Sequence, residues 1–209
     1  MEHRTITASH VALVTATLLF GAAMRWRAEL NIWLSTSAVA LVSFGLTKQW
    51  WYPRLRRLRE PTWMLGAVVG GLSGAITVWA THLVFGLAGP HSTLHQATAC
   101  LYEAVEAIPT VGLGVGVVLL VAGAEEVVWR GLALDMLHHL GVVGAVVGTA
   151  AWYALPMLMG GEGWLALAST ALGLTWATLR LVTGSFTAAY VAHVAWTLGI
   201  LFIWPLAQA

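Results

Sequence analysis

Long apolar runs recur along almost the whole chain and are separated by short polar connections. A helix needs about 20 consecutive apolar residues to cross the hydrocarbon core of a membrane, where its backbone polar groups must be satisfied internally. Charged residues make up only 9% of the 209 residues, against roughly 25% in soluble domains. Too little polar surface remains to cover a water-soluble particle. The sequence therefore predicts an all-α fold, a polytopic membrane helix bundle.

Seven apolar segments are candidates for membrane-spanning helices. They cover residues 9–24, 30–47, 63–88, 110–139, 141–159, 164–182 and 185–206. We expect about seven transmembrane segments in a single membrane domain, residues 1–209. Within it, residues 1–62 hold the N-terminal spans and a basic loop, and residues 110–206 form the core. The first segment also fits the apolar part of a signal peptide, but no small-residue cleavage site follows it, which favours a retained span.

The connection from Lys48 to Glu60 gives the strongest orientation signal. Its basic residues are Lys48, Arg54, Arg56, Arg57 and Arg59, and they accompany Trp50, Trp51 and Tyr52. Basic residues next to a span stay on the cytoplasmic side, and Trp and Tyr favour the interface. Counting spans from this loop places the amino terminus inside and the carboxyl terminus outside. Arg25 and Arg27 then lie on the non-cytoplasmic side, although basic residues prefer the cytoplasmic side.

The connection from Gly89 to Pro109 contains no Lys or Arg and is expected on the opposite side, where it could form a short surface helix. His91 and His95 within it have i,i+4 spacing, which would suit a metal site. The favoured interpretation is that both histidines simply face water at the membrane surface.

Three ionisable residues, Glu125, Glu126 and Arg130, fall inside the fourth apolar segment. Left unpaired at the middle of a bilayer, they would cost on the order of 8–10 kcal/mol. Glu126 and Arg130 have i,i+4 spacing and are expected to form an ion pair. Glu125 points about 100° away around the helix, and a partly unpaired carboxylate suits general-base work on water. We therefore expect Glu126 and Arg130 to act as a brace and Glu125 as the chemical group. The alternative is that all three charges only lock the bundle.

The last apolar segment carries His193, with Thr197 four residues later on the same face. An imidazole and a hydroxyl presented together can stabilise a developing oxyanion. A membrane histidine bonded to a neighbouring helix is the alternative reading. Four other polar residues are weaker candidates: His82, His138, His139 and Arg180.

Two of these blocks resemble a known family. Glu125-Glu126-x-x-x-Arg130-Gly131 resembles the first motif of the CPBP (also called Abi) intramembrane proteases, which include the type II CAAX prenyl endopeptidases. Thr183-Gly184-Ser185-Phe186 followed by His193 resembles the last conserved region of that family. The resemblance implies that Glu125 activates water for peptide hydrolysis and that His193 stabilises the oxyanion, with Thr197 replacing the family's asparagine. The family's middle motif is an aromatic residue followed four positions later by histidine. Here Trp152 and Pro156 occupy those places.

The resulting hypothesis is an intramembrane endopeptidase of the glutamate type. It would hydrolyse a peptide bond in a membrane-anchored or lipidated protein within the lipid bilayer of a bacterial cytoplasmic membrane. Two alternatives stay open: a catalytically degenerate relative acting as a scaffold, immunity or partner-binding protein, and a small transporter or proton-conducting protein. No cofactor or metal is expected, because the chain has no His-Glu-x-x-His run. The formal net charge of +1 gives no reason to expect nucleic acid as a partner.

Overall fold

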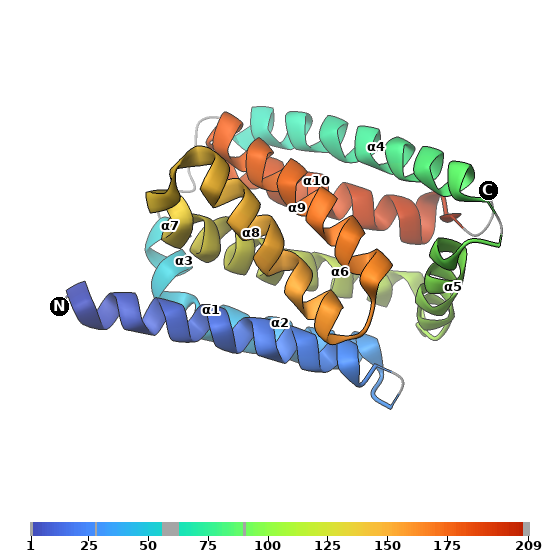
Figure 1. The fold of residues 1–209 in the computed structure, drawn as a ribbon, viewed down its shortest axis with the longest axis horizontal. Helices are drawn as coiled ribbons and strands as arrows, with labels where there is room; N and C mark the ends of the chain where they lie inside the picture. Colours follow the sequence, from blue (N-terminus) through green and yellow to red (C-terminus); the bar gives the residue numbers. More distant parts are fainter. Residues whose placement is uncertain (1, 28, 56–62, 90, 207–209) are drawn as a thin grey trace.

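A computed structural model describes residues 2–27, 29–55, 63–89 and 91–206 (Figure 1). Arg56, Arg57 and Arg59 of the basic loop lie outside these described residues. The long helices are α1 (Glu2–Arg25), α2 (Ile32–Leu46), α4 (Trp63–Ala88), α6 (Val111–Glu126), α8 (Gly141–Met159), α9 (Gly163–Thr183) and α10 (Phe186–Leu198). Shorter elements are α3 (Lys48–Leu55), α5 (Thr93–Glu106), η1 (Val127–Ala133), α7 (Leu134–Leu137), η2 (His138–Leu140) and η3 (Gly199–Ile203). The described part of the chain contains no strand, which confirms the all-α fold.

Five stretches of the described residues are long and apolar enough to cross a membrane. They are Ala8–Arg25, Trp63–Ala88, Val111–Met159, Gly163–Thr183 and Phe186–Ile203. The third has 49 residues, and the chain reverses direction within it at Gly141, whose φ is +75°. Helix α2 has 15 residues, or about 22 Å at 1.5 Å per residue, which is short against a core of about 30 Å. The chain is thus an integral membrane bundle, and the predicted number of seven spans is not confirmed.

The turn between α9 and α10 is set by local sequence. Gly184 ends α9 in the left-handed region with φ +65°. Glycine adopts this conformation without a steric clash because it has no Cβ atom. The Ser185 side chain then accepts a hydrogen bond from the backbone N–H of Ala188 and caps α10. This turn fixes where α10 begins and therefore the height at which His193 lies in the bundle.

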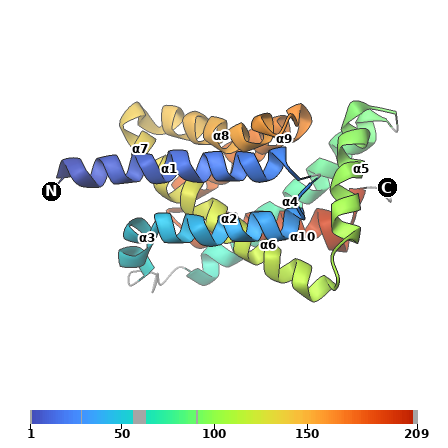
Figure 2. The same cartoon turned by 90° about the horizontal axis from the view of Figure 1, so that it is seen from below.

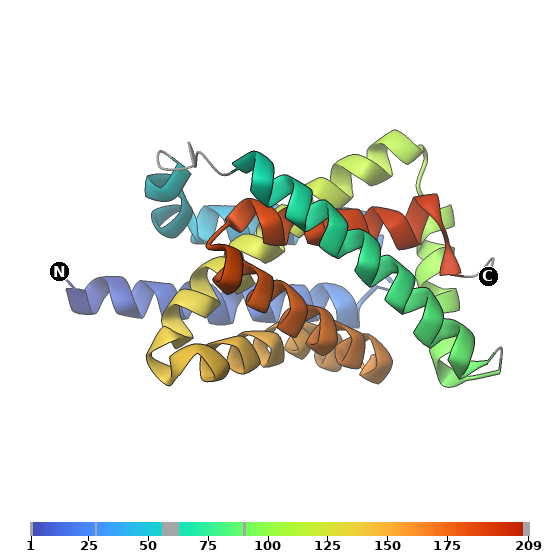
Figure 3. The ribbon, with the colours of Figure 1, turned by 90° about the horizontal axis from the view of Figure 1, so that it is seen from above.

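Helix α10 is held against α4 by small residues. Gly66, Gly70 and Gly74 are buried on one face of α4. A Cβ atom at any of them would meet atoms of α10, those of Ser185, Ala188, Val191, Ala192 and Ala195. Glycines at every fourth position let two backbones approach closely in lipid. Figure 3 shows α4 crossing directly over α10.

The helix ends divide into two groups at opposite ends of the bundle. The amino terminus, α3, α7 and the α9–α10 turn lie at one end, here called the α3 end (Figures 1 and 3). The α1–α2 turn, α5 and the α8–α9 turn lie at the other end, here called the α5 end (Figures 1 and 2). The predicted surface helix between residues 89 and 109 is α5.

Candidate active site

The two glutamates occupy the last two positions of α6, and Arg130 lies in η1 directly after them. Segment η1 is wound as a π-helix, and all seven of its residues are buried. Single π-helical turns inside α-helices are frequent at functional sites because they change the direction in which side chains point.

Glu126 is the centre of a buried ion-pair network. Its Oε1 atom lies 3.1 Å from Nη1 of Arg130, and both side chains are 0% exposed. The same oxygen lies 2.9 Å from Nδ1 of His193. The Glu126–Arg130 pair expected from the i,i+4 spacing is therefore present. The sequence did not reveal that Glu126 also binds the imidazole of α10.

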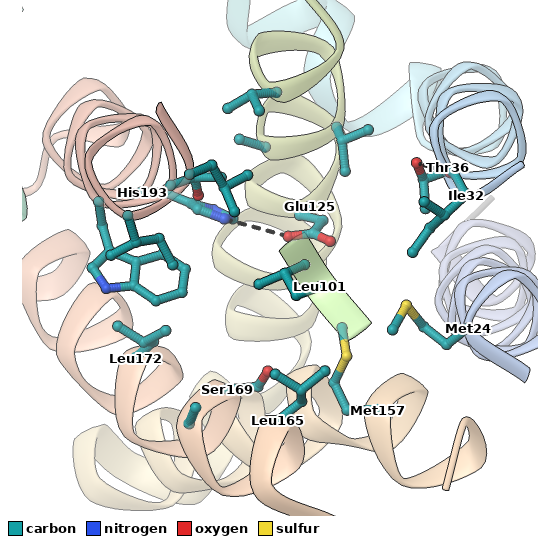
Figure 4. A pocket seen from close by; sticks show the side chains of 18 of the residues that line it. Met24, Ile32, Thr36, Leu101, Glu125, Met157, Leu165, Ser169, Leu172 and His193 are labelled. Carbon is teal, nitrogen blue, oxygen red and sulfur yellow. Dashed lines mark hydrogen bonds and ion pairs between the residues drawn. The ribbon is translucent and has the colours of Figure 1, made fainter. Parts of the chain in front are cut away.

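Glu125 and His193 face each other. Nε2 of His193 lies 3.5 Å from Oε2 of Glu125, and Figure 4 shows both side chains beside one cavity. The hydroxyl of Tyr153 on α8 donates a hydrogen bond to the same Oε2 atom over 3.2 Å. Because Nδ1 of His193 is bound to Glu126, it is Nε2 that faces Glu125 and the cavity.

Aromatic rings enclose the charged groups. The Arg130 guanidinium lies 4.2 Å from the ring centre of Tyr153 and 5.0 Å from that of Trp176, positions that stabilise a cation electrostatically. The Trp176 ring also stacks on His193, with 4.1 Å between ring centres and 19° between planes. The imidazole is therefore fixed on one face by Trp176 and at Nδ1 by Glu126.

A cavity of about 220 Å³ adjoins Glu125 and His193. Its walls are mainly apolar, with Met24, Leu101, Leu165 and Leu172 among them (Figure 4). Besides the indole rings of Trp33 and Trp196, its described lining includes the polar side chains of Thr36, Glu125, Tyr153, Ser169, His193 and Thr197. The volume leaves room for several water molecules, since one water occupies about 30 Å³ in the liquid.

Helix α8 presents Tyr153 and Met157 to the described lining of this cavity. The resemblance places Trp152 and Pro156 at the positions of the family's aromatic residue and histidine. Pro156 is buried inside α8 instead of facing the cavity. The residues that face the cavity, Tyr153 and Met157, are each one position later than Trp152 and Pro156. The second of them lies four residues after an aromatic residue, as the family's histidine does, and carries a thioether.

Thr197 lines the cavity, and its Oγ1 atom is buried without a hydrogen-bond partner among the described residues. Glu125, Glu126, Arg130, His193 and Thr197 are thus brought to one region. Sequence reasoning missed Tyr153 and Trp176. A hydroxyl within the apolar run of α8 was the available signal for Tyr153. No signal in the sequence marked Trp176, because nothing distinguishes it from the other tryptophans among the 12 in the chain.

The weaker candidates lie elsewhere. Nδ1 of His82 is 3.0 Å from the carbonyl oxygen of Val78, and the His82 ring stacks on Trp204. His138 and His139 are exposed at the α3 end. None of these three histidines is among the described residues that line the cavity.

Two further polar candidates, Arg180 and His95, bind nearby groups. Arg180 donates a hydrogen bond to the carbonyl oxygen of Gly184 over 2.7 Å. His95 on α5 contacts Ser92 and stacks on Phe85. Within the described ranges, no group of three or more His, Cys, Asp or Glu residues is placed to hold a metal ion.

The fold and the site define a class: a polytopic membrane protein with a buried carboxylate–imidazole pair beside a cavity. The family model of the type II CAAX prenyl endopeptidases, described as Rce1-like, matches residues 106–199. These residues include both motifs and every charged member of the network. The match confirms the resemblance to the CAAX-protease-like family, and it supports intramembrane proteolysis as the general kind of function. No curated protein and no solved structure matches the chain.

Proposed function

We propose that the protein is an intramembrane endopeptidase of the glutamate type that acts on a membrane-anchored or lipidated protein. We place it in the cytoplasmic membrane of a bacterium. The observation that carries the proposal is the 3.5 Å approach of Glu125 Oε2 to His193 Nε2 at the edge of the cavity. A carboxylate and an imidazole at this distance can share one water molecule, which peptide hydrolysis requires.

Glu125 is the general base in this proposal. It accepts a proton from the water molecule while the water oxygen attacks the carbonyl carbon of the peptide bond. The electron pair of the C=O double bond moves to the carbonyl oxygen. When the C–N bond breaks, Glu125 returns the proton to the leaving nitrogen. The products are a carboxylic acid and an amine, so atoms and charge balance.

His193 acts as an imidazolium with a proton on both ring nitrogens: Nδ1–H donates to Glu126, and Nε2–H donates to the negative oxygen of the tetrahedral intermediate. Preorganised donors aimed at such an oxygen contribute strongly because they need no reorganisation during the reaction. The hydrogen bond at Nδ1 and the stacked Trp176 ring hold the imidazole in place. Thr197, whose Oγ1 has no partner among the described residues, would supply a second donor.

Tyr153 acts as a positioning residue. Its hydroxyl binds Glu125 from α8, the helix in which the family pattern would place a histidine. The bond directs the carboxylate towards His193, and it substitutes for a second imidazole in holding the base. The geometry therefore supports catalysis without a histidine on α8.

The test compares membrane proteins of cells that express the wild type, Glu125→Gln or Glu106→Gln, using mass spectrometry of newly formed peptide termini. Glu106 is an exposed residue of α5, so its substitution makes the same chemical change outside the cavity. We expect a set of cleavages in wild type and Glu106→Gln that is absent in Glu125→Gln. His193→Gln should also lack them.

Identical cleavage patterns in all four strains would reject the proposal. That result, together with normal folding of each variant, would instead favour a degenerate family member that binds partners. Reconstitution of the purified wild type with a substrate found in this way then establishes that cleavage is direct.

A further inference from the structure

The cavity beside Glu125 extends towards one end of the bundle. Helix α6 contributes Val117, Val118, Val121 and Ala122 to its lining, all on the N-terminal side of Glu125. No described residue after Glu125 in η1 belongs to the lining, and η1 is buried throughout. Because α6 begins at the α5 end, the cavity runs from Glu125 towards that end.

A second cavity, of about 360 Å³, continues the first and is here called the vestibule. The two share a wall of five residues: Met24, Ile32, Leu101, Ala104 and Leu165. The vestibule adds three charged residues, Arg27, Glu103 and Glu162, of which Arg27 and Glu162 form an ion pair. Charged side chains in the outer cavity, next to a more apolar inner cavity, suit a route from water to a buried site.

At the α3 end, the described residues line a cavity that is separate from the one at Glu125. This third cavity is lined by Ala8, Thr47, Gln49, Trp50 and Leu132, among others. It shares no lining residue with the cavity at Glu125.

Charge assigns the two ends to the two sides of the membrane. Lys48 and Arg54 lie in α3, and the sequence adds Arg56, Arg57 and Arg59, outside the described residues, to the same connection between α2 and α4. At the α5 end, Arg25 and Arg27 are the only Lys or Arg residues of the described helix ends and turns. Excess Lys and Arg mark the cytoplasmic side. Arg27, which broke this rule in the sequence, is paired with Glu162.

We infer that Glu125 is reached from the non-cytoplasmic side of the membrane, through the vestibule beneath α5. Resting on the proposed function, this assigns the substrate class: the enzyme cleaves a segment that a membrane-anchored protein exposes on its non-cytoplasmic side. An extended peptide enters beside Arg27 and Glu103, passes Met24 and Leu101, and presents its carbonyl group at Glu125.

The test uses cysteine labelling and needs no proteolytic activity. In a Cys100→Ser background, which removes the only native cysteine, single cysteines are introduced as Ala97→Cys in the vestibule, Ser169→Cys in the inner cavity and His138→Cys at the α3 end. A small membrane-impermeant thiol reagent is added either to intact cells or to the same cells after lysis. We expect Ala97→Cys and Ser169→Cys to react before lysis, and His138→Cys only afterwards.

Labelling of His138→Cys but not Ala97→Cys in intact cells would overturn the assignment of sides. A Ser169→Cys that stays unlabelled while Ala97→Cys reacts would overturn the route. Neither labelling result depends on catalysis. If labelling agrees with the route but no cleavage is detected, only the proposed function is rejected. In an active enzyme, a bulky maleimide on Ala97→Cys should lower cleavage strongly relative to the same variant left unmodified.

Discussion

Nδ1 of His193 lies 2.9 Å from Oε1 of Glu126, so the second glutamate of the pair anchors the imidazole that faces the first. The two adjacent glutamates therefore have different surroundings. Glu126 is 0% exposed and bound to Arg130 and His193. Glu125 borders the cavity and receives the Tyr153 hydroxyl. This division predicts that the same substitution affects folding at one position and chemistry at the other.

Glu126→Gln should destabilise the protein by about 3–5 kcal/mol, because it leaves the Arg130 guanidinium as an unpaired buried charge. Glu125→Gln should cost only about 1 kcal/mol, since the amide oxygen still accepts the Tyr153 hydrogen bond. Thermal unfolding of the purified variants in one detergent measures both. The double variant Glu126→Gln/Arg130→Met should recover part of the loss because both charges are removed. Equal unfolding temperatures for the two single variants would contradict a structural role of the Glu126–Arg130 ion pair.

Tyr153→Phe should lower kcat while leaving KM nearly unchanged, because the hydroxyl contacts Glu125 and not the substrate. A hydrogen bond to a charged group contributes about 1.5–3 kcal/mol, which corresponds to a fall in rate of roughly 10- to 150-fold. Steady-state kinetics on a substrate of the enzyme measures the effect. The control is Tyr190→Phe, which removes a hydroxyl bound to the carbonyl oxygen of Leu119 on another face of the bundle. If both variants lose the same activity, Tyr153 does not position the base.

The helices themselves could be predicted from hydropathy. The expected bounds of α4 and α8 agree with the structure, because continuous apolar runs end at polar or glycine-rich connections. Helix α2 proved shorter, since Asn31 caps its start and the helix ends at Leu46. The surface helix α5 was expected, but its position beneath the cavity depends on contacts with distant helices.

Within the site, charge was informative and aromatic character was not. Glu125, Glu126 and Arg130 stood out because a lipid environment penalises unpaired charges, and His193 stood out as a titratable group in an apolar helix. Aromatic residues fill many packing positions in a membrane protein, so nothing in the sequence separated Trp176 from the others. Helical phase explains the difference on α8, where Tyr153 and Met157 face the cavity in place of Trp152 and Pro156.

Gly131→Ala should destabilise the segment that carries Arg130. A Cβ atom there would overlap the six-membered ring of Trp50 from α3, and Trp50 is also fixed by a 2.9 Å hydrogen bond from Nε1 to Asp135. Overpacking of this kind costs about 1–3 kcal/mol. In a double-mutant cycle with Trp50→Leu, the smaller side chain should relieve most of the cost of Gly131→Ala. Additive losses in thermal unfolding would show that the two residues are not coupled.

Gly70→Ala and Gly71→Ala are adjacent substitutions with opposite expected outcomes. At Gly70 the new methyl group would meet the backbone of Ala188 on α10, which cannot move without shifting the helix that holds His193. At Gly71 nothing lies within 4 Å of the added atom. We expect Gly70→Ala to lower the unfolding free energy by about 1–3 kcal/mol and to reduce cleavage. Gly71→Ala should leave cleavage intact and stabilise the protein by up to about 1 kcal/mol, because alanine favours helix more than glycine does. Equal behaviour of the two variants, by thermal unfolding and by cleavage, would mean that close packing of α4 on α10 does not set the position of His193.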